Sequence, residues 1–270
     1  MLALQNSANR KDNSRLPKTG REEALILVKA LPHVGQRHGE TVCCAGVTRN
    51  GEWRRQYPIH FRRLRDEGQF KRWQWIEYDW IAPGNDDRRQ ESRRVQEDTI
   101  KVGKSISKTE RAAFLAPLIT RSTAEAVSQG QSLTLVRPIE SRFHWKAKTA
   151  RQIADERQAY EAAARQTSFL DQDLVALDPC PYAFHFDWKD ANGASHKSTC
   201  DDWETAAMFY RREKAVGAKG ALAEMSKAFN EQYPQNGMVF ALGTHSRRAE
   251  QWLLVGVIRL DEQKQAGLAV

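Results

Sequence analysis

The front half of the chain alternates strand-like apolar runs with turn residues. One apolar run covers residues 22–33, and two further runs, 40–49 and 52–61, stand on either side of Asn50-Gly51. Asn and Gly both tolerate a positive φ, so this pattern predicts an antiparallel hairpin closed by a type I′ turn. After a short helical piece, the alternation of bulky and polar side chains in residues 74–83 predicts another strand.

The middle of the chain favours helices between strands. A charged loop over 84–94 precedes a strand-like run at 99–106, and short helices are expected over 108–119 and 122–130. The run 132–148 predicts a strand that is interrupted at Pro138. Residues 149–166 are rich in good helix formers and place Glu161 four residues before Arg165, so they predict the clearest helix of the chain.

Hairpin signals return in the last third. Aromatic residues alternate from Tyr182 to Trp188 and Asn192-Gly193 follows, which predicts a second hairpin over 182–199. We expect helices over 200–215 and 220–233, then strands over 238–243 and 252–260. Antiparallel hairpins with inserted helices are typical of the α+β class, and they favour curled sheets or small barrels over a doubly wound sheet.

Changes in composition suggest how the chain is divided. Residues 1–21 are polar and basic, which predicts a disordered tail. The expected parts that follow are an N-terminal β-rich module over 22–150, a connecting helix over 151–170, a C-terminal α+β module over 171–262 and a short tail over 263–270.

Charge and composition narrow the function classes. Forty-two Lys and Arg against 34 Asp and Glu give the 270-residue chain a net charge of +8, which attracts polyanions. Phosphate-loop and GxGxxG motifs are missing, so nucleotide hydrolysis and dinucleotide chemistry lose their usual support. No apolar run suits a signal peptide or a membrane span, and the four cysteines follow no disulfide or CxxC spacing. We therefore expect a cytoplasmic protein with no membrane partner.

Residues 41–80 interleave arginines with tryptophans and tyrosines. Guanidinium groups pair with phosphates, and each base stacked on an aromatic ring contributes about 1–3 kcal/mol, so the mixture predicts an interface for DNA or RNA. The candidate side chains, with two arginines from the last loop, are Arg49, Trp53, Arg54, Arg55, Tyr57, Arg62, Arg63, Arg65, Lys71, Arg72, Trp73, Arg247 and Arg248. The alternative is that the rings form a barrel core and the arginines its solvated outside, because tryptophan is mostly buried in any fold.

A second constellation lies where the second hairpin leads into a helix. His196, Cys200, Asp201 and Glu204 are all metal-ligand types, which makes a divalent metal ion the candidate cofactor, with His196 and Cys200 as its ligands. Together with His245, the set His196, Asp201 and Glu204 could perform acid–base work on a phosphodiester. The alternative needs no metal: Asp201 as helix N-cap and Glu204 three residues later form a capping-box-like pair.

Several segments together resemble an uncharacterised prokaryotic protein family. They are ETVCCAG and EWRRQYPIHFR within 40–62, QWIEYDW at 74–80, SLTLVRP at 132–138, PYAFHF, H-x3-C-DDWE and LGTHSRRAEQWLLVGV. The resemblance covers most of the chain from 22 to 260 and implies a connection with mobile-element or phage-defence loci, but no established activity. Similar proteins carry further cysteines before the histidine of the H-x3-C-DWE segment. This chain has Asp187, Trp188 and Lys189 there, so a zinc site is not carried over.

Three hypotheses follow for function. The first is a nucleic-acid-binding protein that engages the phosphate backbone and unstacked bases of DNA or RNA through the arginines and aromatic rings. The second is a metal-dependent nuclease that uses His196, Asp201, Glu204 and His245. The third is an adaptor whose basic surface binds an acidic protein partner, such as another protein of a defence complex.

Overall fold

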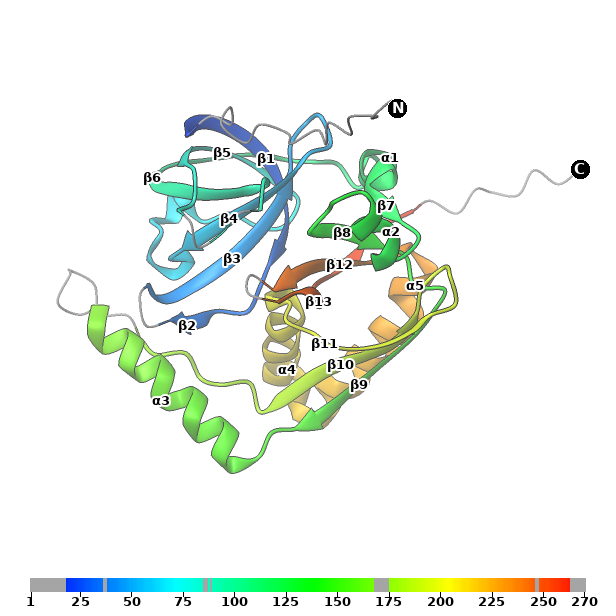
Figure 1. Cartoon of the computed structure of the whole chain (residues 1–270). Coiled ribbons are helices and arrows are strands. Elements are labelled where there is room, and N and C mark those ends of the chain that lie inside the picture. Colours follow the sequence, from blue (N-terminus) through cyan, green and yellow to red (C-terminus); the bar gives the residue numbers. More distant parts are fainter. Residues whose placement is uncertain are drawn as a thin grey trace, which may run out of the picture.

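The N-terminal strands curl into a closed barrel, shown in blue and cyan in Figure 1. The computed structural model describes residues 18–35, 38–84, 87, 89–167, 175–245 and 248–262. The strands are β1 (Thr19–Lys29), β2 (His33–Gly35), β3 (Gly39–Val47), β4 (Trp53–Ile59), β5 (Gln74–Ile81) and β6 (Ser92–Ser105). Their order is β1-β5-β6-β4-β3-β2, and β1 also pairs with β3, so β1, β5, β6, β4 and β3 form a ring within the described residues.

Strand β5 shows why the barrel forms. Its alternation directs Ile76, Tyr78 and Trp80 into the barrel, where none is more than 4% exposed. Trp75 belongs to the opposite face and is also buried, because that face packs on a second sheet. Two short 3-10 turns, η2 (Phe61–Arg63) and η3 (Asp66–Gly68), connect β4 to β5.

The second sheet lies beside the barrel and is buried on both faces. It contains β7 (Ile119–Thr120), β8 (Leu133–Val136), β12 (Met238–His245) and β13 (Arg248–Arg259), in the order β13-β12-β8-β7. One face packs on the barrel and the other on the C-terminal helices. Burial on two sides explains why β12 is an almost continuous apolar run rather than an alternating one. The short helices α1 (Arg111–Leu115), η4 (Ala116–Leu118) and α2 (Thr123–Ser128) precede β8.

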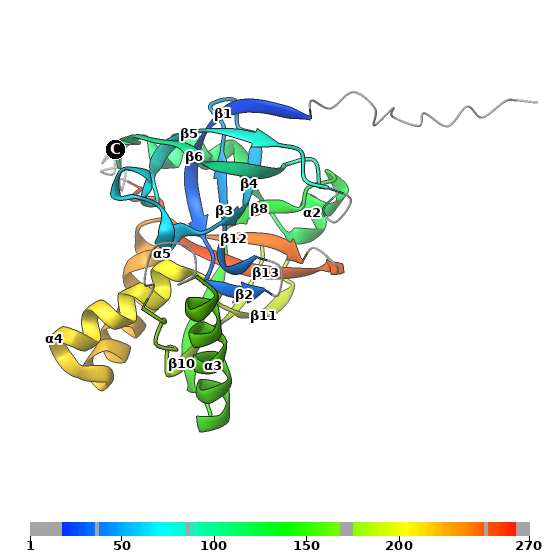
Figure 2. The same ribbon diagram turned by 90° about the vertical axis from the view of Figure 1, so that its left-hand side faces the viewer.

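The third layer is a three-stranded sheet with helices. Strands β9 (Glu140–Ala147), β10 (Tyr182–Lys189) and β11 (Ser195–Thr199) pair in the order β11-β10-β9. Helix α3 (Ala150–Thr167) follows β9 and precedes β10 along the chain, and Figure 2 shows it extending away from the sheets. Helix α4 (Trp203–Lys227) is kinked at Gly217 and continues into the π-helix η6 (Ala228–Gln232) and α5 (Tyr233–Gln235). These elements confirm the predicted α+β class with curled antiparallel sheets, a small barrel and inserted helices.

Both predicted hairpins form, but the first does not have the predicted type I′ turn. Only Gly51 and Gly193 have a positive φ in the Asn-Gly pairs, so neither turn is type I′. In each loop the glycine amide donates to the residue three positions before it, Gly51 to Thr48 and Gly193 to Asp190. The Asn-Gly pair therefore ends a longer turn rather than forming the whole connection.

Two expected boundaries are wrong. Strand β1 begins at Thr19, so residues 18–21 belong to the barrel and not to a tail, because they pair with the last residues of β5. Strands β8 and β9, which we placed in the N-terminal module, pair with β12 and β10 instead, and β7 pairs with β8. The expected tails at 1–17 and 263–270 lie outside the described residues. No helix in the described part of the chain is long and apolar enough to cross a membrane.

The barrel depends on a close approach at Gly46. A Cβ atom there would lie 2.6 Å from the backbone oxygen of Leu25, which cannot move without breaking the pairing of β1 with β3. We expect Gly46→Ala to lower the free energy of unfolding by about 1–3 kcal/mol, as overpacked cores do. Chemical denaturation measures this change.

Gly35→Ala is the matched control, because nothing lies within 4 Å of its Cβ position and its φ is not positive. It should alter the unfolding free energy by less than about 1 kcal/mol. Equal effects of the two substitutions would contradict the packing described for Gly46.

Candidate functional site

The aromatic rings predicted to stack on bases are mostly buried. Trp53 and Trp73 are 9% and 8% exposed and belong to the core between the barrel and the second sheet. Among the three candidate rings only Tyr57 is well exposed, at 41%. The expectation of an outward aromatic face is therefore wrong for Trp53 and Trp73. The alternative, that these rings form core, describes their positions correctly.

The arginines predicted to contact phosphates are largely paired with carboxylates. Arg49 donates two hydrogen bonds to Glu23, at 2.6 and 2.8 Å, and Arg54 binds Glu22 at 2.9 Å. Arg62 binds Glu40 at 3.1 Å. Glu22 and Glu23 come from β1, outside the aromatic segment. These charges are therefore paired with carboxylates of neighbouring strands, and the contact of these arginines with phosphate stays a prediction.

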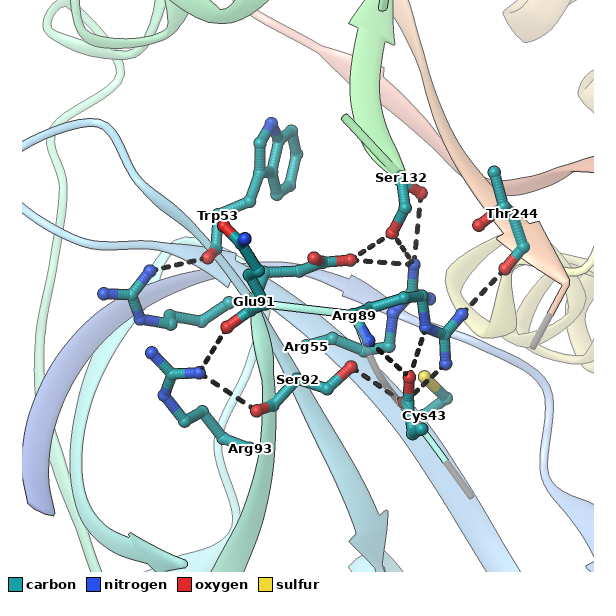
Figure 3. Close-up of polar contacts among 12 residues, drawn as sticks. Cys43, Trp53, Arg55, Arg89, Glu91, Ser92, Arg93, Ser132 and Thr244 are labelled. Atoms are coloured by element: carbon teal, nitrogen blue, oxygen red, sulfur yellow. Dashed lines mark hydrogen bonds and ion pairs between the residues drawn. The ribbon is translucent and has the colours of Figure 1, made fainter. Parts of the chain in front are cut away.

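Arg55 lies in a buried polar cluster that joins the barrel to the second sheet (Figure 3). The residue is 5% exposed, and its Nη2 atom donates to the backbone oxygen of Ser132 at 3.2 Å. Glu91 lies 3.7 Å from the same nitrogen atom. Next to it, Arg89 is held by Asp87 and donates to the backbone oxygen of Thr244 at 2.9 Å. Arg55 was predicted to bind nucleic acid, but its burial gives it a structural role.

The remaining predicted binders lie in several places. Arg65, Lys71 and Arg248 are exposed, whereas Arg63 is half-buried and makes contacts of its own. Arg72 enters a cavity described below. Arg247 lies outside the described residues.

The predicted metal ligands do not meet. His196 shares a hydrogen bond of 2.9 Å with Asp190 at the hairpin turn and stacks on Trp188. Cys200 is buried and its thiol lies 3.7 Å from the Thr205 hydroxyl. Burial raises the pKa of the Cys200 thiol, which disfavours the thiolate that a metal needs. Among the described residues no three His, Cys, Asp or Glu side chains are grouped for a metal ion.

The predicted catalytic set is dispersed in the same way. Asp201 pairs with His33 at 3.1 Å, Glu204 pairs with Lys29 at 3.1 Å, and His245 ends β12 opposite Arg248. The helix cap is Asp202 rather than Asp201, since the Asp202 side chain accepts the amide hydrogen of Glu204. His196, Asp201 and Glu204 each pair with a different residue, so the structure does not gather these three around one group.

A basic cavity of about 700 Å³ opens where the barrel meets α4, η6 and β13. Lys29 ends β1, Arg111 begins α1 and Arg259 ends β13. Among its described lining residues the acidic ones are Glu204 and Asp261, and the basic ones are Lys29, Lys71, Arg72, Arg111, Arg211, Arg212 and Arg259. We call this site the basic cavity.

Carboxylates balance only part of the positive charge in the basic cavity. Asp261 accepts from both Arg111 and Arg259, at 2.5 and 2.6 Å. Arg72 donates to Asp202 at 2.6 Å and to the backbone oxygen of Val257 at 2.8 Å. The Nε atoms of Arg72 and Arg111 are buried and have no hydrogen-bond partner among the described residues. Each of these guanidinium groups therefore keeps one N–H donor that no described acceptor uses.

Aromatic rings hold three of these cations in place. The Arg111 guanidinium lies 4.3 Å from the centre of the Trp73 ring, and Arg259 lies 5.6 Å from that of Tyr233. Lys29 lies 5.5 Å from the Trp203 ring. Cation–π contacts of this length stabilise a charge inside a partly buried wall.

Sequence reasoning missed most of the basic cavity. It identified Lys71, Arg72, Trp73 and Glu204, but for other roles. One local signal was available, since Glu204, Met208, Arg211 and Arg212 recur at helical spacing and line the cavity from one stripe of α4. The other residues come from elements that only the fold brings together.

The charges of the basic cavity have a measurable consequence for Glu204. Burial alone would raise the pKa of Glu204, but the charges of Lys29, Arg72 and Arg211 outweigh it and hold that pKa below the ordinary range. A depressed carboxyl pKa contributes stability that is complete above about pH 4.3 and is lost as the pH falls through the folded-state pKa. Glu204→Gln should therefore lose less unfolding free energy than the wild type between about pH 6 and about pH 3.

Denaturation at several pH values measures this difference, and Glu140→Gln provides the control. Glu140 lies outside the cavity, pairs with Lys189 and has a side chain that is 65% exposed. A wild-type acid dependence in Glu204→Gln would contradict the electrostatic description of the site.

Two protein families match the chain, with a boundary where the barrel gives way to the second sheet. Residues 20–119 match a domain of unknown function, DUF8758, and residues 118–269 match a domain of unknown function, DUF8757. The comparison with curated proteins gives no match. Lys29, Lys71, Arg72 and Arg111 fall in the first matched region, and the rest of the charged cavity lining falls in the second. Because the second match covers more than half of the chain, the protein belongs to the DUF8757 family and carries a DUF8758 region before it.

Proposed function

We propose that the protein binds nucleic acid and that the basic cavity receives a phosphate group of that nucleic acid. The observation that carries this proposal is the gathering of seven basic residues around a single cavity, where the carboxylates that line it or pair with its arginines are Glu204, Asp261, Asp202 and Glu224. Phosphate contacts supply most of the sequence-independent affinity for nucleic acids, and they come mainly from Lys and Arg side chains.

Two cavity residues are best suited to a first contact with phosphate. Lys71 and Arg211 are exposed, and neither forms an ion pair with a carboxylate in the described part of the chain. Their charges are therefore available without breaking an existing pair. The net charge of +8 adds a long-range attraction that guides a polyanion toward the protein.

Binding is favoured over cleavage by the positions of the predicted catalytic residues. Glu204 lines the basic cavity, whereas His196 and His245 are not among its described lining residues. General acid–base catalysis needs its groups within hydrogen-bond reach of the same reacting atoms. A binding site needs only the concentration of positive charge.

Removing the two unpaired charges tests the proposal. We expect the double substitution Lys71→Ala and Arg211→Ala to weaken binding of a short single-stranded oligonucleotide by about tenfold or more. The logarithmic salt slope should fall by about 0.7 for each lost phosphate contact, or about 1.4 for both. Fluorescence anisotropy with DNA and RNA over a range of salt concentrations measures both quantities.

The matched control is the double substitution Lys146→Ala and Arg151→Ala. Both residues are exposed and lie outside the basic cavity, so the control removes the same net charge from another place. Equal losses in the two double variants would refute a local site. No binding of any oligonucleotide at about 50 mM salt would overturn the function itself. In that case, binding of an acidic peptide at the cavity would favour an adaptor.

A further inference from the structure

The basic cavity is suited to an end group rather than to a length of backbone. Its volume of about 700 Å³ lies within the range of about 300–1,000 Å³ that encloses one small ligand. A space of this size encloses a group with the dimensions of a small ligand but not a length of duplex. What enters must therefore be a projecting group with the dimensions of a nucleotide.

The charge of the basic cavity also exceeds what an internal phosphodiester requires. An internal phosphate carries one negative charge, whereas a phosphomonoester carries about −1.5 to −2 at neutral pH and offers three acceptor oxygens. Lys71 and Arg211 are unpaired within the described residues, and Arg111 and Arg259 share the single carboxylate Asp261. A dianion matches this excess better than a monoanion does.

We infer that the basic cavity binds a phosphomonoester, carried either by the end of a nucleic-acid strand or by a free nucleotide. The inference rests on the proposed function for its first source, the strand end, but not for its second. Its chemical basis is the set of guanidinium and ammonium groups that line the cavity, of which those of Lys71 and Arg211 are exposed and form no ion pair among the described residues.

Crowding of like charges supports an anionic ligand. Burial lowers the pKa of Arg111, Asp261 opposes this effect, and the nearby charges of Arg259 and Arg72 lower the pKa further. Like charges held this close repel one another, and a bound dianion relieves the repulsion. The cation–π contacts with Trp73 and Tyr233 keep the guanidinium groups in place.

Glu204 acts against the ligand. Its carboxylate forms an ion pair with Lys29 at 3.1 Å and places a negative charge in the cavity. A phosphomonoester must therefore compete with Glu204 for Lys29 and overcome its repulsion. Removing the Glu204 charge should strengthen binding, whereas a catalytic Glu204 would give a loss of activity with no gain in affinity.

The test compares strand ends on one sequence. Three oligonucleotides of the same sequence carry a 5′-phosphate, a 3′-phosphate or only hydroxyl ends, and adenosine monophosphate and adenosine provide the free-nucleotide arm. Binding to the full chain is measured by anisotropy for the oligonucleotides and by calorimetry for the nucleotides. We expect at least one phosphorylated ligand to bind about tenfold more tightly than its hydroxyl counterpart.

Variants locate the effect. Lys71→Ala with Arg211→Ala should abolish the preference for the phosphate end, and Glu204→Gln should increase the affinity for it several-fold. Glu140→Gln should change neither, because Glu140 lies outside the cavity. Thermal unfolding with and without ligand checks that each variant is folded and still binds.

The outcomes separate this inference from the proposed function. If all three oligonucleotides bind equally and Lys71→Ala with Arg211→Ala weakens them equally, nucleic-acid binding stands and the phosphomonoester inference is overturned. If adenosine monophosphate binds but no oligonucleotide does, the inference stands with a free nucleotide as ligand and the proposed function fails. If Glu204→Gln weakens phosphate binding while remaining folded, the competition ascribed to Glu204 is wrong and the inference falls with it.

Discussion

The buried carboxylate of Asp202 holds the three parts of the structure together. Its side chain is 1% exposed and accepts hydrogen bonds from Arg72 at 2.6 Å, from the Thr205 hydroxyl at 3.1 Å and from the backbone amides of Glu204 and Val257 at 3.2 Å. A buried charge costs several kcal/mol unless it is paired and hydrogen-bonded, so these partners must be present together. Through them Asp202 caps α4, anchors β13 and fixes the loop before β5, and the basic cavity is built around this junction.

The same rule of pairing decides where the positive charge of the molecule is available. On the barrel, Glu23, Glu22 and Glu40 form ion pairs with Arg49, Arg54 and Arg62, which the sequence suggested for phosphate contacts. Arg55 is buried beside Glu91 and donates a hydrogen bond to Ser132. Around Asp202, three arginines share two carboxylates: Asp202 pairs with Arg72, and Asp261 pairs with both Arg111 and Arg259. The basic cavity therefore keeps an excess of positive charge, to which Lys71 and Arg72 from the end of the aromatic segment contribute.

Local patterns predicted the elements, and distant partners decided the rest. The hairpins, the helix at 150–167 and the α+β class could be read from alternation, turn residues and helix propensity. The choice of Asp202 over Asp201 as helix cap could not, because both suit the position and the selection is made by Arg72 and Val257. The burial of Trp53 and Trp73 could not be predicted for a similar reason. A sequence pattern shows that the two faces of a strand differ in polarity, but it does not show that other parts of the protein cover both faces. The cavity draws on both matched families, so no single segment displays it.

The basic cavity combines fixed and exposed charges, and the two kinds serve binding differently. Arg72, Arg111 and Arg259 are held by carboxylates and rings, so their side-chain entropy was already lost when the protein folded and little further ordering is needed to bind an anion. Lys71 and Arg211 are exposed and can adapt to the incoming group. Preorganised donors favour one geometry of the anion, whereas adaptable ones contribute mainly attraction. Selectivity should therefore come from Arg72, Arg111 and Arg259, which are held in place. Because Asp202 and Asp261 position them, selectivity is a property of the junction between the two regions rather than of either one.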